Sequence, residues 1–137
     1  MADMFSNIRC LVITPEAQVV DAEVLDVVIP AYDGLRGVYP GHACLLCLLG
    51  LGLLRYHDLQ NRSHVVFIEG GFGHVCDNEV TILTRTALTA DAVTTTEARE
   101  QLRQAEGQPT STIEEVQARR AAIRRAKQLL TLTLSRE

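Results

Sequence analysis

Two groups of side chains in this sequence have types and spacings that could carry chemistry, and the first is a pair of cysteines. Cys44 and Cys47 form a C-x-x-C, the spacing of many redox and zinc sites. Those sites place the pair on a turn or at a helix N-terminus, whereas residues three apart in a strand point to opposite faces. Cys10 and Cys76 have no close spacing partner. We therefore interpret all four as buried structural cysteines and expect no disulfide and no metal site.

The second group is formed by four histidines that could act as general bases: His42, His57, His64 and His74. None has a nearby serine or cysteine in a recognised nucleophile setting, so we expect no catalytic residue and no cofactor. His42 follows Pro40 and Gly41, where a histidine either donates a turn-stabilising hydrogen bond or contributes to an interface. Both interpretations of His42 stay open.

The elements that must position these residues fall into two kinds, and the first is β structure. Short apolar runs separated by turn residues predict an all-β sandwich or barrel. The expected strands are 8–14, 18–22, 23–30, 37–39, 43–49, 52–58, 63–69, 71–76 and 79–84. In the last of them Val80 and Ile82 should face the core, with Leu83 on the other side. Turns are expected at 32–34, 58–61 and 77–78.

Beyond residue 87 the apolar period changes from 2 to about 3.6, which predicts two helices. Thr94 with Glu97 and Ser111 with Glu114 form capping boxes at their starts. The first helix should end at Gly107 in a left-handed conformation. The apolar stripe expected on the second contains Ile113, Val116, Ile123 and Leu130, widened by Leu129 and Leu134. The fold class predicted is an all-β sandwich N-terminal domain (1–86) followed by an α-helical hairpin (87–137), with a hinge near 87–93.

Composition and charge exclude several classes of protein. Hydrophobic residues make up 47% of the 137, which is enough for a core. The longest apolar stretch, 43–54, is shorter than the roughly 20 residues of a membrane-spanning helix. Residues 1–86 carry 10 acids and 5 bases, and 87–137 carry 7 acids and 8 bases. An excess of one base does not indicate a nucleic-acid partner. No secretory signal is present at residues 1–10.

The segment from Gly37 through Pro40, Gly41 and His42 to Leu46 reads G-V-Y-P-G-H-A-C-L-L. It resembles the G-x-x-P-G-H-A-P-L turn of the epsilon subunit family of F-type (rotary) ATP synthases. The order of the surrounding segments is also similar: Thr-Pro-Glu at 14–16, Val-Val-Ile-Pro at 27–30, the strand at 52–55, Glu-Gly-Gly-Phe at 69–72, which includes Gly70 and Gly71, and the strand at 78–83. The resemblance covers residues 8 to about 135.

This resemblance implies a non-catalytic central-stalk (rotor) subunit whose sandwich docks on the gamma subunit and the c-ring. It places a c-ring interface at Asp33, Leu35, Arg36 and His42, although Leu35 stands where the family has an acidic residue. Cys44 likewise replaces the family's proline. The expected location is the cytoplasmic face of the bacterial plasma membrane, where the chain would be peripheral and held through its partner subunits. The plastid thylakoid is the alternative.

A basic cluster on the second helix has two interpretations. It consists of Arg119, Arg120, Arg124, Arg125 and Lys127. It is either a solvated helix face or, as the resemblance implies, a surface that engages the alpha and beta catalytic subunits and inhibits ATP hydrolysis. Nucleotide binding is not expected, because the family's ATP motif keeps Asp91 here but has Thr94 in place of arginine. The alternative to the rotor is a free-standing β-sandwich adaptor unrelated to ATP turnover.

Overall fold

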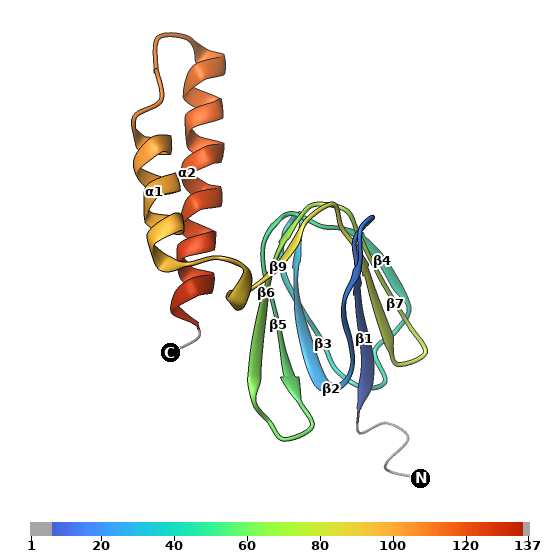
Figure 1. Cartoon of the computed structure of the whole chain (residues 1–137). Helices are drawn as coiled ribbons and strands as arrows, with labels where there is room; N and C mark the ends of the chain where they lie inside the picture. Colours follow the sequence, from blue (N-terminus) through green and yellow to red (C-terminus); the bar gives the residue numbers. More distant parts are fainter. Residues whose placement is uncertain (1–6, 136–137) are drawn as a thin grey trace. The chain divides into compact units, whose positions relative to one another are not determined.

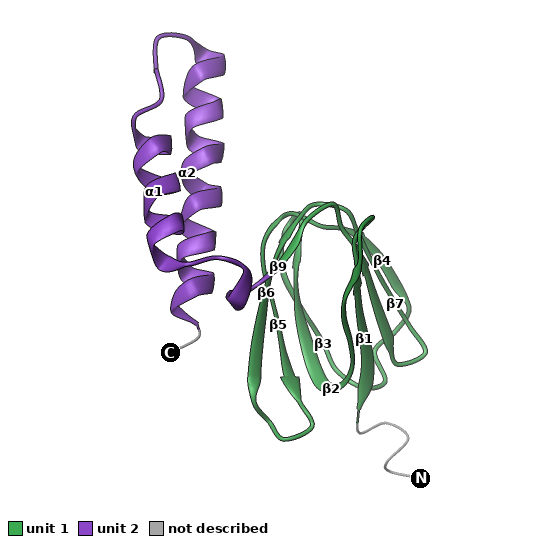
Figure 2. Ribbon diagram, in the orientation of Figure 1, with its two compact units in different colours: residues 1–88 green, residues 89–137 purple. Residues whose placement is uncertain are grey.

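The computed structural model describes residues 7–135, which divide between Leu88 and Thr89 into two compact units (Figures 1 and 2). The first unit is built from strands and the second from helices, as expected for the fold class. The strands are β1 (Ile8–Ile13), β2 (Gln18–Ala31), β3 (Gly34–Val38), β4 (Leu45–Leu48), β5 (Leu51–Asp58), β6 (Ser63–Glu69), β7 (Phe72–Cys76), β8 (Glu79–Leu83) and β9 (Ala87–Thr89). The helices are η2 (Ala90–Ala92), α1 (Thr95–Glu106) and α2 (Ile113–Leu134).

The strands form one continuous sheet in the order β4-β7-β8-β1-β2-β5-β6-β9, with β3 paired to β2. Strands β1 and β8 run parallel, whereas the pairs β1–β2, β2–β5, β5–β6, β4–β7 and β7–β8 are antiparallel. The long strand β2 pairs with β1 through Gln18–Val24 and with β3 and β5 beyond that point. Its register with β5 shifts between Val24 and Asp26. A strand that changes partners at a bulge turns the corner between the two layers of a sandwich.

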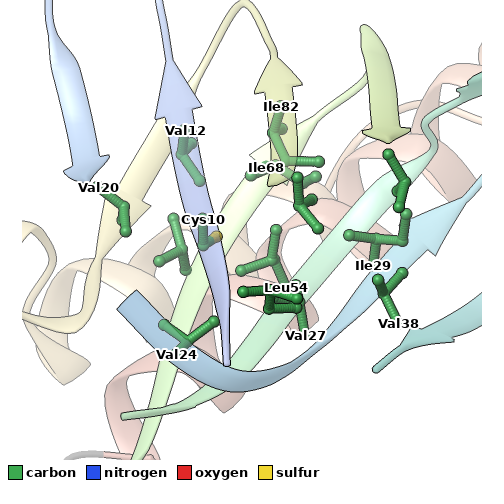
Figure 3. Close-up of a cluster of buried hydrophobic side chains, with 14 of the residues drawn as sticks. Cys10, Val12, Val20, Val24, Val27, Ile29, Val38, Leu54, Ile68 and Ile82 are labelled. Atoms are coloured by element: carbon green, nitrogen blue, oxygen red, sulfur yellow. The ribbon is translucent and has the colours of Figure 1, made fainter. Parts of the chain in front are cut away.

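The core lies between these layers and is built from the inward side of each strand (Figure 3). Val80 and Ile82 of β8 are fully buried whereas Leu83 is half exposed, which confirms the alternation expected there. Cys10 and Val12 of β1 are also fully buried. Burial of so many branched aliphatic side chains is the main source of stability for this unit.

The turns follow the expected residues, and the strands differ from prediction in three places, the first being the strand expected at 37–39, which is β3 and begins three residues earlier, at Gly34. Asp77 and Asn78 both have positive φ, at 53° and 59°, which fits the two-residue turn that joins β7 to β8. The predicted strands 18–22 and 23–30 are one strand, because the bulge bends the chain without ending it. The short strand β9 lies in the segment expected to be a hinge and pairs with β6.

Helix α1 begins as predicted, with Thr94 and Glu97 forming a complete capping box. It ends at Gly107, but φ there is −85°, so the expected left-handed conformation is wrong. The chain instead closes through the Gly107 N–H, which reaches the carbonyls of Arg103 and Gln104 at 3.2 Å each. The last turn tightens without needing a positive φ.

The N-cap of α2 was predicted one position too early, and the predicted apolar stripe is correct only in part: Leu129 is buried, Val116, Ile123 and Leu130 are half-buried, and Leu134 is 49% exposed. The N-cap is Thr112, whose hydroxyl accepts from the Glu115 N–H at 3.1 Å, and not Ser111. Ile113 is therefore in the first turn, beyond the contact with α1, and is 74% exposed. The fully or nearly fully buried residues of α2 are Ala126, Leu129, Leu132 and Thr133.

Candidate interaction surfaces

The outward side of β1, β4, β7 and β8 carries apolar side chains in register. Leu48 lies opposite Phe72, Phe72 opposite Leu83, and Leu83 beside Ile13. Leu46 lies in the next row, opposite His74. We call these five residues, Ile13, Leu46, Leu48, Phe72 and Leu83, the apolar face.

Large side chains of the apolar face are exposed to solvent to an unusual degree. Leu46 is 66% exposed and Leu48, Phe72 and Leu83 are 51–55% exposed. The face continues into a hollow lined by Ile13, Pro15 and Leu83. A contiguous apolar surface on a sheet that already has a core on its other side indicates a site for another protein.

Sequence reasoning did not find this face, although a signal for it exists. The run 43–49 is apolar at every position rather than at alternate ones. A strand at the edge of a sheet with apolar residues on both sides has one side that the core does not use. Leu83 carries the same signal, because it lies on the side of β8 shared by Glu79 and Thr81.

The residues predicted to contact the c-ring are divided between the two ends of β3. Asp33, Leu35 and Arg36 lie together on the β2–β3 hairpin, where an Arg36 Nη2 is 3.9 Å from Asp33 Oδ2. Leu35 is 74% exposed, and Arg36 Nε is a buried nitrogen without a hydrogen-bond partner among the described residues. His42 lies beyond the other end of β3. The structure therefore does not bring His42 to the hairpin.

His42 sits in a turn held by the chain around it. Its Nδ1 lies 2.6 Å from the Ala43 carbonyl oxygen, which can only accept, so Nδ1 carries the proton in this contact. The Gly41 N–H donates to Asn78 Oδ1 at 2.7 Å, which ties the turn to the β7–β8 connection. Gly41 itself has φ of +82°. These contacts agree with the interpretation of His42 as a turn-stabilising residue. Its role in an interface stays a prediction.

Gly71 is the motif glycine with the strictest requirement. Its φ is +103°, and a Cβ at this position would collide with the Leu83 carbonyl oxygen and lie 2.9 Å from Thr84 Cα. The Gly71 carbonyl accepts from the Leu49 N–H at 2.9 Å. The close approach at Gly71 thus joins the ends of β4, β7 and β8 beneath the apolar face.

The cysteines correct two expectations. Cys44 and Cys76 form a disulfide, with their Cα atoms 4.2 Å apart. The spacing in the sequence hides this pair, but the β4–β7 register reveals it: Leu45 lies opposite Val75, so Cys44 lies opposite Cys76. Cys44 is exposed rather than buried. The interpretation of Cys44 as a buried free thiol was therefore wrong.

The remaining cysteines and the nearby carboxylate complete the local chemistry. Cys10 is buried, and burial raises the pKa of its thiol to about 12. Cys47 faces the opposite side of β4, toward Gly73. Among the described residues, a carboxylate oxygen of Asp77 lies within 4.8 Å of both bonded sulfurs. Because these sulfurs are bonded to each other, they offer no thiolate to a metal ion.

Two histidine–aspartate pairs on the β5–β6 hairpin were not predicted. His57 Nδ1 lies 2.8 Å from Asp26 Oδ1, and His64 Nε2 lies 2.8 Å from Asp58 Oδ2. The contact with His64, together with the N–H groups of Arg62 and Gln60, lowers the pKa of Asp58 to about 2. Asp58 closes the hairpin as a hydrogen-bond acceptor, and within residues 7–135 the side-chain hydrogen-bond partner of each histidine is an aspartate rather than a nucleophile.

The five basic residues of α2 do not form one surface. Arg119 donates through Nε to the Glu106 carbonyl at 3.2 Å, and Arg125 donates to Gln101 Oε1 at 3.2 Å. These two arginines join α2 to the end and the middle of α1. Arg120, Arg124 and Lys127 are exposed and follow a single stripe, as expected for residues four and three apart.

Comparisons with known proteins match the strand unit to a family model and most of the chain to individual relatives. Residues 7–90 match the model of the family described as ATP synthase, delta/epsilon chain, beta-sandwich domain. The chain is 39% identical over 121 residues to the ATP synthase epsilon chain of Rhodopirellula baltica, covering 88% of this chain and 94% of that one. It is 34% identical over 125 residues to the ATP synthase epsilon chain of Nitratidesulfovibrio vulgaris, covering 90% and 92%.

Solved structures show the same fold at lower sequence identity. A chain in the cryo-EM structure of the Euglena gracilis mitochondrial ATP synthase OSCP/F1/c-ring assembly superposes with a TM-score of 0.71 and 21% identity, covering 96% of this chain and 81% of that one. A chain of the Tetrahymena thermophila mitochondrial ATP synthase central stalk and c-ring gives a TM-score of 0.63 and 16% identity, covering 90% and 96%.

Proposed function

The chain belongs to the delta/epsilon chain family of ATP synthases, and on that premise we propose that it binds the gamma subunit through the apolar face and the c-ring through its β2–β3 hairpin. It is an accessory, non-catalytic subunit of the rotor. Family membership argues against the alternative of a free-standing adaptor. The single observation that carries the docking proposal is the apolar face itself.

The gamma subunit is the partner that fits the apolar face best. Stable interfaces bury about 800 Å² on each partner and concentrate apolar side chains at their centre. The rows from Leu46 to Ile13 supply such a centre on a rigid sheet, which suits a subunit that must turn together with its partner without slipping.

A charge placed in the apolar face tests this docking. Leu48→Asp should abolish co-elution with the cognate gamma subunit on size-exclusion chromatography, because a carboxylate would be buried without a partner. Leu59 is a matched control, since it is 48% exposed but lies in the β5–β6 turn. If Leu59→Asp and Leu48→Asp both co-elute with gamma at one copy per gamma, the apolar face is not the docking site.

The hairpin residues Asp33 and Leu35 are exposed and Arg36 is partly exposed, which indicates a second, more polar contact that we assign to the c-ring. Reversing the charge of Arg36 with Arg36→Glu and truncating Leu35 with Leu35→Ala should weaken the coupling of ATP hydrolysis to ion pumping in assembled membranes. His42→Gln is a separate variant, because His42 lies at the other end of β3. Normal pumping in the hairpin variant would overturn this assignment.

The helical hairpin is proposed to inhibit ATP hydrolysis by contact with the alpha and beta subunits. The stripe of Arg120, Arg124 and Lys127 is the part of the basic cluster that is free to reach an acidic partner. Replacing these three with Ala should raise the hydrolysis rate and reduce its dependence on salt. Removal of residues 89–137 should give at least the same increase. An unchanged rate in both variants would refute the regulatory role.

The location follows from the complex rather than from the chain. No helix within residues 7–135 is long and apolar enough to cross a membrane. An ATP synthase subunit is membrane-associated through its assembly, and we propose that this one lies on the cytoplasmic face of a bacterial plasma membrane. Degradation by protease in inverted vesicles but not in intact cells would support this, and protection in both would contradict it.

A further inference from the structure

The position of the Cys44–Cys76 disulfide suggests a role beyond the fold. It joins residues at one end of two neighbouring strands, where β4 meets the loop that precedes it. β4 is at the edge of the sheet, contains four residues and has β7 as its partner. A short edge strand has few hydrogen bonds, so its order depends on how its two ends are held.

The two ends of β4 are held differently. After Leu48 the chain is fixed by the backbone: Leu49 donates to Gly71, Tyr32 donates to Leu48, and Ala31 bridges to Leu49. Before Leu45 the constraints are the disulfide and the hydrogen bond from Gly41 to Asn78. Loss of the disulfide therefore frees the half of β4 that carries Leu46, and leaves the half that carries Leu48 anchored.

We propose that Cys44 and Cys76 form a reversible dithiol–disulfide site that clamps the edge strand of the apolar face when oxidised and releases it when reduced. The co-reactant is a dithiol reductant. The site differs from the other thiols of the chain, since Cys10 is buried and Cys47 faces the opposite side of β4. That the clamp tunes binding of the gamma subunit rests on the docking proposed above.

The exchange can be written from the exposure of the two sulfurs. Cys44 is the exposed member, so a thiolate of the reductant attacks its Sγ, the Sγ–Sγ bond breaks, and Cys76 leaves as a thiolate that takes up a proton. The second thiol of the reductant then attacks the mixed disulfide and releases Cys44. Two electrons and two protons pass to the protein, and the reductant becomes a disulfide.

The environment makes such a bond regulatory rather than permanent. Disulfides in a cytosolic compartment are reduced unless they form transiently, and exposed ones exchange fastest. A chain on the cytoplasmic side would therefore hold this pair as thiols under reducing conditions and as a disulfide under oxidative stress.

A redox titration of the full-length protein tests the site. Samples equilibrated at graded ratios of reduced to oxidised glutathione would be alkylated and mapped by mass spectrometry. Cys44 and Cys76 should gain alkylation together, as one two-electron couple, while the labelling of Cys47 does not change. Independent titration of the two residues, or no oxidation in excess oxidised glutathione, would overturn the proposal.

Amide hydrogen exchange tests the clamp in the same samples. Reduction should speed exchange at residues 43–46 by about tenfold or more and leave residues 49 and 50 unchanged. The double variant Cys44→Ser/Cys76→Ser should exchange like the reduced protein in both conditions, and Cys47→Ser should behave like wild type. Equal exchange at 43–46 in the oxidised and reduced protein would refute the clamp.

Binding of the gamma subunit separates this inference from the proposed function. Tighter binding by the oxidised protein, with no redox effect in the double variant, supports the tuning of docking. Equal binding in both states refutes the tuning. Absence of binding in both states, with a normal redox titration and exchange pattern, overturns the docking proposal and leaves the redox site supported.

Discussion

Removing the Cys44–Cys76 bond should destabilise the sandwich by an amount that can be worked out from its place in the chain. The bonded residues are 32 apart in the sequence. Constraining a loop of that length in the unfolded chain corresponds to about 3.7 kcal/mol on the chain-entropy relation. Measured disulfides often deliver less than this relation predicts, so the expected loss of unfolding free energy is about 2–4 kcal/mol.

Urea unfolding followed by tyrosine fluorescence is a suitable assay. The three tyrosines, Tyr32, Tyr39 and Tyr56, all lie in the strand unit, and the chain has no tryptophan, so the signal reports the sandwich. With an m-value of about 1.5 kcal/mol/M, the midpoint should fall by about 2 M on reduction. The slope should rise slightly, because the unfolded chain without the cross-link exposes more surface.

Two variants decide whether the effect belongs to this bond. Cys44→Ser/Cys76→Ser should unfold at the midpoint of the reduced protein and should not respond to reductant. Cys47→Ser keeps the disulfide and should retain the full response. A midpoint shift of less than about 0.3 M on complete reduction of the wild-type protein would refute the loop-entropy reasoning.

Three further predictions concern single positions. Gly71→Ala should lower the free energy of unfolding, measured in urea, by at least about 2 kcal/mol, because Gly71 has a positive φ and the β8 backbone lies beside it. Gly107→Ala is the control and should not lower it by this amount, because φ at Gly107 is negative. Thr112→Ala should reduce helical stability by about 1 kcal/mol, whereas Ser111→Ala should have little effect, as measured by thermal unfolding followed by circular dichroism. If instead Ser111→Ala were the destabilising variant, Ser111 would be the N-cap. Asp58 has a folded pKa of about 2, below the unfolded value of about 3.9, so its contribution to the free energy of unfolding is complete above about pH 4 and is lost as pH falls toward 2. Asp58→Asn should therefore flatten the plot of unfolding free energy against pH in that range. An unchanged plot would show that the carboxylate contributes nothing.

The fold class followed from period and turn chemistry because those signals are local. The two-residue turn at Asp77 and Asn78 and the capping box at Thr94 were each predicted from neighbouring residues and are present. Such contacts form between residues a few positions apart, so the residue types that form them can be recognised in the sequence. The bulge in β2 was missed because it depends on β5, a strand distant in the sequence.

The candidate surfaces were harder to predict, because they depend on which strands are neighbours. Leu48, Phe72 and Leu83 become one row only when β4, β7 and β8 are placed in order. The same register pairs Cys44 with Cys76, which no spacing rule for sequences would suggest. Sequence patterns assign a side chain to a face of its own strand, but the composition of a face is a property of the sheet.

The two units differ in what holds them together, and that difference bears on regulation. The sandwich has a cluster of fifteen buried hydrophobic residues, fourteen from seven of its strands and Leu49 from the connection between β4 and β5, and most of them are branched. The helical hairpin buries mainly alanines and two leucines in its helices, and a buried alanine contributes far less than a buried leucine. Contacts such as Arg119 to the Glu106 carbonyl add little, because they are exposed to water. A hairpin held this weakly needs only a small binding free energy from a partner to change its arrangement. A contact that transmits rotation must instead stay formed under load. The chain thus has its apolar face, the proposed docking site for the gamma subunit, on the firmly packed unit and its exposed basic stripe on the loosely packed one.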